Sequence, residues 1–193
     1  DGWDDRILDD TNKVMKKVHL GCWHRDFDGY INVDIVNLPH INYKSEINNL
    51  PFFSDNSIDY IYCSHALEYY NYDEASLALK EWYRVLKPGA LLRIAVPDFD
   101  SLLNVYNKTN DLTNIIGPLY GRMDIDGVAI YHKQVYNFSR LKNQLKFIGY
   151  KEIQKYDWKK TDHSQYDDHS QAYYPHMAKE CGILVSLNIE CKN

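Results

Sequence analysis

The stretch KVHLGCWHRDFDGYINVDI, residues 17–35, limits the choice of fold more than any other part of the chain. A short strand-like run at 18–20 meets Gly21, and a second run at 31–35 carries Asp34 close to its end. A strand, a glycine turn, a second strand and a terminal acid is the order in which a nucleotide-type cofactor site begins in parallel α/β proteins.

The connection between the two runs is too short for a dinucleotide site. Asp34 follows Gly21 by 13 positions, whereas a parallel crossover usually takes a dozen or more residues and carries a helix. A dinucleotide site also needs the pattern G-x-G-x-x-G, and Trp23 stands where its second glycine would be. The stretch therefore disfavours a phosphate-dependent cofactor and leaves open an adenosyl cofactor without phosphate.

Strand-like segments recur along the chain and alternate with two segments of helical periodicity. The expected strands are 17–20, 30–36, 58–63, 91–96, 150–156 and 183–191. The first helix is expected in NYDEASLALKEWYRVLKPG, with Asp73 as N-cap and Pro88-Gly89 as its stop, and the second in FSRLKNQLKFIGY, with Ser139 as N-cap and Gly149 as its stop. The apolar residues that share a helical face are Ala75, Leu79, Trp82 and Leu86 in the first, and Leu141, Leu145 and Ile148 in the second.

This alternation predicts an α/β fold with a mostly parallel sheet covered on both faces. The last strand-like segment alternates more regularly, with Ile183, Val185, Leu187 and Ile189 on one face. We therefore expect it to be an antiparallel strand near an edge of the sheet.

Composition narrows the class of protein. The chain has 193 residues, enough for one domain with a full core. Its formal net charge of −5 argues against nucleic acid as the main partner. No segment approaches the roughly 20 apolar residues of a membrane span. The acidic start DGWDDRILDD lacks a signal-peptide pattern, and four scattered cysteines without a CxxC pair fit a reducing cytoplasm.

No repeat or linker divides the chain, so residues 1–193 are expected to form a single domain with a polar lead-in at 1–16. Two segments, 104–137 and 157–180, look irregular, and long irregular segments in a small α/β domain are usually functional. We expect both to border the substrate, the second as a lid.

The motifs HLGCWHRDFDGYINVDI, NNLPFFSDNSIDYIYCSHALEYY and EWYRVLKPGALLRIAVPDFD follow one another in the order seen in one family. Together they resemble a branch of the class I S-adenosylmethionine-dependent methyltransferases with a shortened first crossover, similar to methyltransferase type 11. The far end, YDWKKTDHSQYDDHSQAYYPHM and SLNIECK, is similar to members associated with sugar and polysaccharide biosynthesis. The resemblance covers residues 17–192 and implies a Rossmann-like three-layer sandwich with a shortened or missing first helix.

The resemblance also implies where S-adenosyl-L-methionine would bind. Asp34 is placed to accept hydrogen bonds from the ribose hydroxyls, and Glu46 with the Ile47 backbone would meet adenine. The methionine half would lie against the remaining residues, namely Gly21, Cys22, Trp23, Ser64 and His65. Trp23 and Ala90 replace glycines of the family pattern, and Tyr69 replaces a histidine. The indole of Trp23 must therefore point away from the cofactor or stack on it. Asp98 either faces substrate or caps the next segment.

The histidines of the second half suggest a proton acceptor rather than a metal site. His132, His163, His169 and His176 match no zinc spacing, so no metal is expected. Transfer to a hydroxyl requires a base near neutral pH, and the candidates are His169 and His132.

We thus expect an S-adenosylmethionine-dependent methyltransferase that acts on a hydroxyl of a small molecule, sugar or nucleotide sugar, by O-methyl transfer. A degenerate, non-catalytic binding module that has lost the turn glycine is the alternative, and a nicotinamide-dependent oxidoreductase is a distant third. The sequence leaves the acceptor and a homo-oligomeric state open.

Overall fold

The computed structural model describes residues 14–193, so most of the expected lead-in at 1–16 lies outside the described residues. The strands are β1 Lys17–Leu20, β2 Tyr30–Asp34, β3 Tyr43–Lys44, β4 Ile58–Ser64, β5 Leu86–Pro97, β6 Met123–Ile125, β7 Val128–Ile130, β8 Lys151–Lys155, β9 Tyr173–Tyr174, β10 Ile183–Leu184 and β11 Ser186–Lys192. The helices are α1 Tyr72–Val85, α2 Phe99–Thr109, α3 Thr113–Tyr120 and α4 Phe138–Ile148, with the 3₁₀ turns η1 Leu67–Tyr69, η2 Trp158–Lys160 and η3 His169–Gln171.

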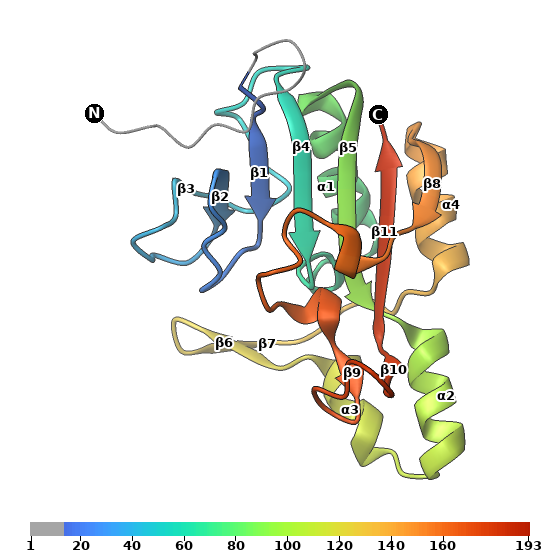
Figure 1. Ribbon diagram of the computed structural model, residues 1–193. Helices are drawn as coiled ribbons and strands as arrows, with labels where there is room; N and C mark the ends of the chain where they lie inside the picture. The colour runs from blue at the N-terminus through green and yellow to red at the C-terminus, as the bar shows by residue number, and fades with distance from the viewer. Residues whose placement is uncertain (1–13) are drawn as a thin grey trace.

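Seven strands form the central sheet in the order β3-β2-β1-β4-β5-β11-β8 (Figure 1). The first five are parallel to one another, whereas β11 runs antiparallel to both β5 and β8. The mostly parallel α/β sheet with an antiparallel strand near the C-terminal edge is thus confirmed, and β8 rather than β11 is the outermost strand.

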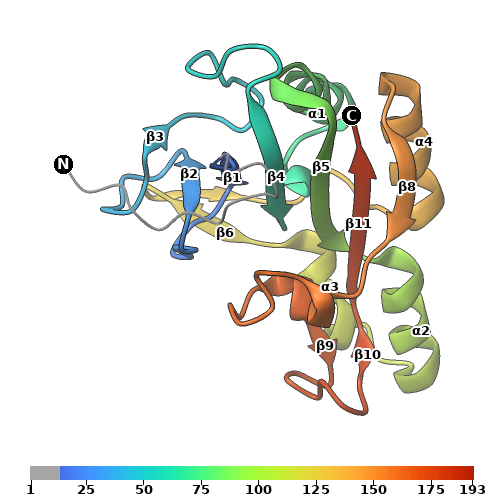
Figure 2. The same cartoon turned by 45° about the horizontal axis from the view of Figure 1, so that its top comes forward.

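One face of the sheet is covered by helices. Figure 1 shows α1 and α4 behind the sheet, and Figure 2 shows α4 behind β8 in the turned view. The two helices contact each other. The core between helices and sheet contains Leu79 and Trp82 of α1 with Leu20 of β1, all buried, and the Trp82 indole N–H donates to the backbone oxygen of Ile47. This packing holds the strands in place, and with them the loops that follow the strand ends.

The opposite face carries no helix between β1 and β2, because residues 21–29 form only turns. Its cover comes from the segment that follows β8, which crosses in front of β4 and β5 in Figure 1. There Phe27 and Tyr62 belong to a buried aromatic cluster. The ring of His163 lies nearly parallel to that of Phe27 and tilted by 34° against that of Tyr62. The late segment thus takes the place of the missing first helix.

Two expected helix starts are wrong by two residues. The N-cap of α1 is Asn71, not Asp73, because the Asn71 side chain accepts from the backbone N–H groups of Asp73 and Glu74 in a capping box. The N-cap of α4 is Asn137, not Ser139. In both cases an earlier asparagine offers its oxygen to the first free N–H groups.

The segment 104–137 is more regular than expected. It holds the end of α2, all of α3 and the antiparallel hairpin β6–β7. The sequence pattern did not predict α3, because this helix is short and contains Gly117-Pro118, two residues typical of turns. Asp98 caps α2, since its carboxylate accepts from Asp100 N and from the Ser101 hydroxyl, so of the two roles expected for Asp98 the structure assigns the capping one.

Candidate active site

A cavity of about 1570 Å³ opens at the carboxyl ends of the parallel strands. Gly21 follows β1, Asp34 ends β2, Ser64 ends β4 and Pro97 ends β5, and all four line the cavity. Figure 1 shows the hairpin β6–β7 beyond the arrowheads of β1, β2 and β4, and its residues also line the cavity. This is the edge where open α/β sheets bind ligands, and the volume exceeds the ~300–1,000 Å³ of a typical ligand pocket.

The turn after β1 is built by a glycine and a strained tryptophan. Gly21 has φ +64, and a Cβ there would lie 2.5 Å from the Cβ of Ala66, so only glycine fits. Trp23 also has positive φ, +49, a conformation costly for a bulky residue. Two hydrogen bonds hold it: its N–H donates to Asp34 Oδ2 at 2.8 Å, and its carbonyl oxygen lies 2.7 Å from His40 Nε2.

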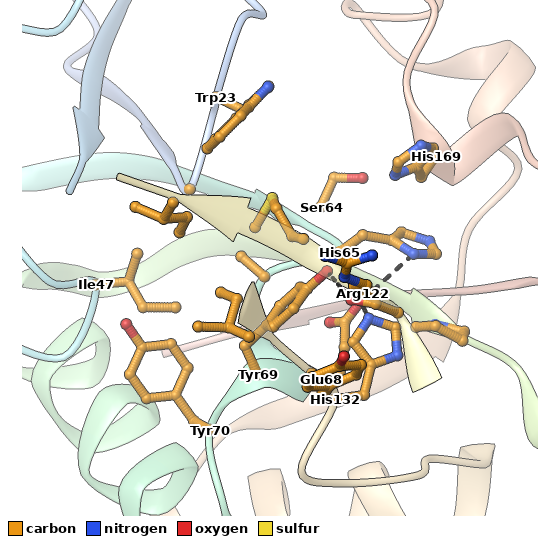
Figure 3. A pocket seen from close by; sticks show the side chains of 18 of the residues that line it. Trp23, Ile47, Ser64, His65, Glu68, Tyr69, Tyr70, Arg122, His132 and His169 are labelled. Carbon is orange, nitrogen blue, oxygen red and sulfur yellow. Dashed lines mark hydrogen bonds and ion pairs between the residues drawn. The ribbon is translucent and has the colours of Figure 1, made fainter. Parts of the chain in front are cut away.

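The indole of Trp23 lines the cavity without filling it. Figure 3 shows it standing apart from the cluster of His65, Glu68 and His132. Cys22, by contrast, is buried behind the turn with 1% exposure and does not line the cavity. Burial raises the pKa of its thiol to about 12, so only its backbone can take part in ligand contacts.

The carboxylate of Asp34 is turned inward, with 6% of the residue exposed. Its Oδ2 accepts from Trp23 N–H and its Oδ1 from Val36 N–H at 3.1 Å. Each carboxylate oxygen can accept a further hydrogen bond. A fixed acid with spare acceptor capacity at the cavity wall fits the two hydroxyls of a ribose, as an adenosyl cofactor would present.

The neighbouring wall fits the rest of an adenosyl group. Glu46, Ile47 and Asn48 line the cavity together, and Glu46 accepts a hydrogen bond from the Tyr70 hydroxyl. The hydroxyl of Ser64 is buried at the cavity with no hydrogen-bond partner among the described residues. An unpartnered hydroxyl beside the turn is free to meet a polar group of a ligand.

The two histidines expected to act as base both line the cavity, from different elements. His132 follows β7, and burial lowers its pKa. His169 lies in η3 at an exposed position. Desolvation of its ring lowers its pKa, and so does the nearby charge of Arg25. Both imidazoles are therefore neutral at pH 7 and able to accept a proton.

Gly121 determines where the ring of His132 sits. Its backbone has φ +53, and a Cβ on it would lie 1.8 Å from His132 Nε2. The His132 Nδ1 is 2.9 Å from the carbonyl oxygen of Pro118, and the ring meets Tyr69 edge-on at 4.6 Å between centroids. The last residues of α3 and Gly121 thus fix the position of the His132 ring.

The expected lid at 157–180 lies mainly on the sheet face. Of this segment, Asp167, His169 and Ala172 line the cavity, whereas His163 is 1% exposed within the aromatic cluster and His176 lies at the surface. In the described part of the chain no three His, Cys, Asp or Glu side chains are grouped to hold a metal ion.

The sequence reasoning missed Glu68, which is fully buried at the cavity between His65 and His132 (Figure 3). A signal was present, because Glu68 interrupts an apolar run directly after the fourth strand and three residues after His65. Arg25 and Arg122 also line the cavity and carry no such signal.

The comparisons with known proteins agree with this geometry. Residues 30–94 match a family model described as a methyltransferase domain. The ubiquinone/menaquinone biosynthesis C-methyltransferase UbiE of Haemophilus ducreyi is 27% identical over 164 residues, which are 79% of this chain and 60% of that protein. The chain therefore spans less than two thirds of this relative.

Solved structures with the same fold are more distant in sequence. A possible histamine N-methyltransferase from Thermotoga maritima superposes with a TM-score of 0.59 at 17% identity, covering 92% of this chain and 81% of that chain. The 1,6-didemethyltoxoflavin-N1-methyltransferase of Burkholderia thailandensis, with bound 1,6-didemethyltoxoflavin and S-adenosylhomocysteine, gives 0.54 at 11% identity, covering 93% and 71%.

Among the described residues no helix is long and apolar enough to cross a bilayer. The Thermotoga maritima structure is described as an S-adenosylmethionine-dependent methyltransferase, and the Burkholderia thailandensis structure contains S-adenosylhomocysteine. The chain has the fold of the S-adenosylmethionine-dependent methyltransferases, and its residues 30–94 match the methyltransferase domain family.

Proposed function

We propose that this protein is an S-adenosylmethionine-dependent methyltransferase that methylates a hydroxyl of a small molecule or sugar, in the synthesis of a surface polysaccharide. The observation that carries the proposal is the inward carboxylate of Asp34, fixed by two backbone donors at the wall of a large cavity. The methyltransferase-domain match over residues 30–94 supports it. The sugar acceptor rests on the resemblance of the C-terminal region alone.

Asp34, Glu46 and the Ile47 backbone would hold the adenosyl part, and the turn at Gly21, Cys22 and Trp23 would border the methionine part. When bound, S-adenosylmethionine supplies a methyl group already activated by a sulfonium. Tyr69 and Tyr70 line the cavity, and aromatic faces stabilise a nearby cation. The chain contributes alignment of the reactants and exclusion of water.

The proton of the acceptor hydroxyl would pass to a neutral imidazole, and we assign this role to His132 or His169. Both pKa values lie below the usual range, so each ring is unprotonated at pH 7. A positioned general base contributes typically ~10²- to 10⁴-fold to the rate. Ser64 and His65 line the same cavity as these histidines and the glycine turn.

Calorimetry with S-adenosylmethionine and S-adenosylhomocysteine tests the cofactor site. Asp34→Asn should weaken binding about 10- to 100-fold, because hydrogen bonds to a charged group are worth about 1.5–3 kcal/mol. Asp100→Asn, at an exposed position of α2 outside the cavity, is the matched control and should bind normally. Equal affinities for both variants would refute the role of Asp34.

Turnover is measured as S-adenosylhomocysteine release with a panel of hydroxylated sugars and nucleotide sugars. Replacing the true base, His132→Ala or His169→Ala, should lower kcat about 100-fold or more while cofactor affinity stays within a few-fold. Full turnover in both variants would exclude both histidines as the base.

Trp23 favours a second candidate function, a non-catalytic binding module, because its indole borders the cavity at the position where the methyltransferase pattern that the sequence resembles has glycine. The same calorimetry separates the two readings. No measurable affinity for either form of the cofactor would support the non-catalytic module and refute the enzyme.

A further inference from the structure

Glu68 occupies an unusual position, because it is fully buried and both its carboxyl oxygens lack a hydrogen-bond donor among the described residues. Its Oε1 lies 3.5 Å from His65 Nδ1 and 3.7 Å from His132 Nε2. Burying an ionised carboxylate without donors is costly. Which of these three atoms carries a proton therefore decides the chemistry of this end of the cavity.

The hydrogen-bond network fixes the tautomer of His65. The amide nitrogen of Asn188 donates to the carbonyl oxygen of Ser170 at 2.8 Å, so the Asn188 Oδ1 is directed at Ser186. That oxygen can only accept, and the Ser186 hydroxyl must donate to it. Ser186 Oγ then accepts from His65 Nε2–H at 2.9 Å. In the neutral ring, His65 Nδ1 is left as a bare lone pair facing Glu68.

The same reasoning fixes His132. The carbonyl oxygen of Pro118, 2.9 Å from His132 Nδ1, can only accept, so Nδ1 carries the hydrogen. The neutral ring therefore presents its Nε2 lone pair to Glu68. Burial lowers the pKa of both histidines, which favours these neutral forms at pH 7.

Three proton acceptors thus converge with no hydrogen between them if Glu68 is ionised. One proton on Glu68 relieves the conflict, since a carboxylic acid donates its O–H to one lone pair and carries no negative charge toward the other. Burial raises the pKa of Glu68 to about 8, which agrees with the geometry.

The other groups around Glu68 leave it without a countercharge. Cys63 on β4, Tyr69 in η1 and Tyr136 before α4 are close enough for the charge of Glu68 to act on them, and burial raises the pKa of each of them, so all three are neutral at pH 7. The charges of His169, His132 and Arg25 also lower the pKa of His65. Within residues 14–193, no lysine or arginine forms an ion pair with Glu68, and the nearby Lys133 pairs with Glu74.

We propose that Glu68 is a protonated carboxyl group at neutral pH and directs its single O–H to the lone pair of His65, the nearer of the two, so that the Nε2 lone pair of His132 stays free to accept a proton. Glu68 is then a positioning residue: its O–H satisfies one imidazole and keeps the base-bearing side of the cavity uncharged. This assignment extends the proposed methyl transfer, because loss of the proton places an anion beside His132 and sets an alkaline limit on turnover.

Two variants of similar size separate the protonated from the ionised form. Glu68→Gln replaces the acid by an amide that still donates to a lone pair, whereas Glu68→Leu removes the donor. We expect Glu68→Gln to keep kcat at pH 7 within about threefold and to lose the alkaline limb of the pH–rate profile. Glu68→Leu should lose about tenfold or more. If Glu68→Gln loses as much as Glu68→Leu, the carboxyl is ionised and the proposal fails.

A spectroscopic measurement tests the same point without turnover. Infrared difference spectra between pH 7 and pH 9.5 should show loss of a protonated-carboxyl band in the wild type that is absent from Glu68→Gln. Long-range ¹H–¹⁵N spectra at pH 7 should show His65 as the Nε2–H tautomer and His132 as the Nδ1–H tautomer. An imidazolium at either residue would overturn the assignment. If both spectra agree and no methyl transfer is found, the proposed function fails while the protonation of Glu68 stands.

Discussion

Gly121→Ala offers the sharpest test of how the fold positions His132. A Cβ at Gly121 would lie 1.8, 2.1 and 2.2 Å from three atoms of the His132 ring, so the imidazole must leave its place. Gly127→Ala is a matched control in the same region, because Gly127 has φ +80 and nothing within 4 Å of its added Cβ. Both variants carry the same type of backbone penalty, and only Gly121→Ala displaces the histidine.

The backbone penalty is about 1–2 kcal/mol for each variant, partly offset by about 0.4–1 kcal/mol from the stiffer unfolded chain. Gly121→Ala additionally loses the hydrogen bond between His132 and the Pro118 oxygen and the edge contact with Tyr69. These are worth about 0.5–1.5 kcal/mol each. Gly121→Ala should therefore be less stable than Gly127→Ala by about 1–3 kcal/mol, or about 2–12 °C in Tm for a chain of this length.

Thermal and urea unfolding of the two variants measure this difference, and the His132 ring signals in NMR spectra report its displacement. If His132 is the base, kcat should fall about 100-fold or more in Gly121→Ala and stay near the wild-type value in Gly127→Ala. Equal Tm values together with an unmoved His132 signal would refute the packing of this ring on Gly121.

Two further predictions concern stability. Burial lowers the pKa of His19 to about 3 and of His163 to about 4, from an ordinary 6.5, so the unfolded chain binds more protons than the folded chain below pH 6.5. The free energy of unfolding should therefore fall by about 2 kcal/mol per histidine between pH 7 and pH 5, and it should fall less in His19→Phe. An unfolding midpoint that does not change with pH in this window would contradict both pKa shifts. Asn71→Ala should lower the free energy of unfolding by about 1 kcal/mol in urea, because it removes the N-cap of α1. The control Asn107→Ala, on the exposed face of α2, should change this free energy by less than about 0.5 kcal/mol.

The sequence predicted best those elements whose residue patterns lie within a short stretch of the chain. Four of the six expected strands match the observed ones within two residues because strand-like runs are bounded by turn formers. The expected strand 91–96 is only the second half of β5, which already begins at Leu86, and 183–191 is divided between β10 and β11, which belong to different sheets. The buried face of α1 follows the helical spacing of Ala75, Leu79 and Trp82. The position of Asp34 at the end of β2, beside the cavity, follows from the same local pattern.

The hairpin β6–β7 and helix α3 were missed because their local signals are weak. Each hairpin strand has three residues, and α3 contains a proline. A hairpin of this size is marginal alone, and here it forms part of the cavity wall. Its existence depends on neighbours that are distant in the chain.

The sequence by itself determined the parallel α/β frame, the glycine turn and the acid at the end of the second strand, because hydrophobic periodicity and turn chemistry act between residues close in the chain. The tertiary structure alone decided that residues after β8 cover the sheet face left bare between β1 and β2, and that Glu68 meets the lone pairs of His65 and His132. The protonation of a buried carboxyl depends on which groups surround it in space, and His132 reaches Glu68 from 64 positions further along the chain.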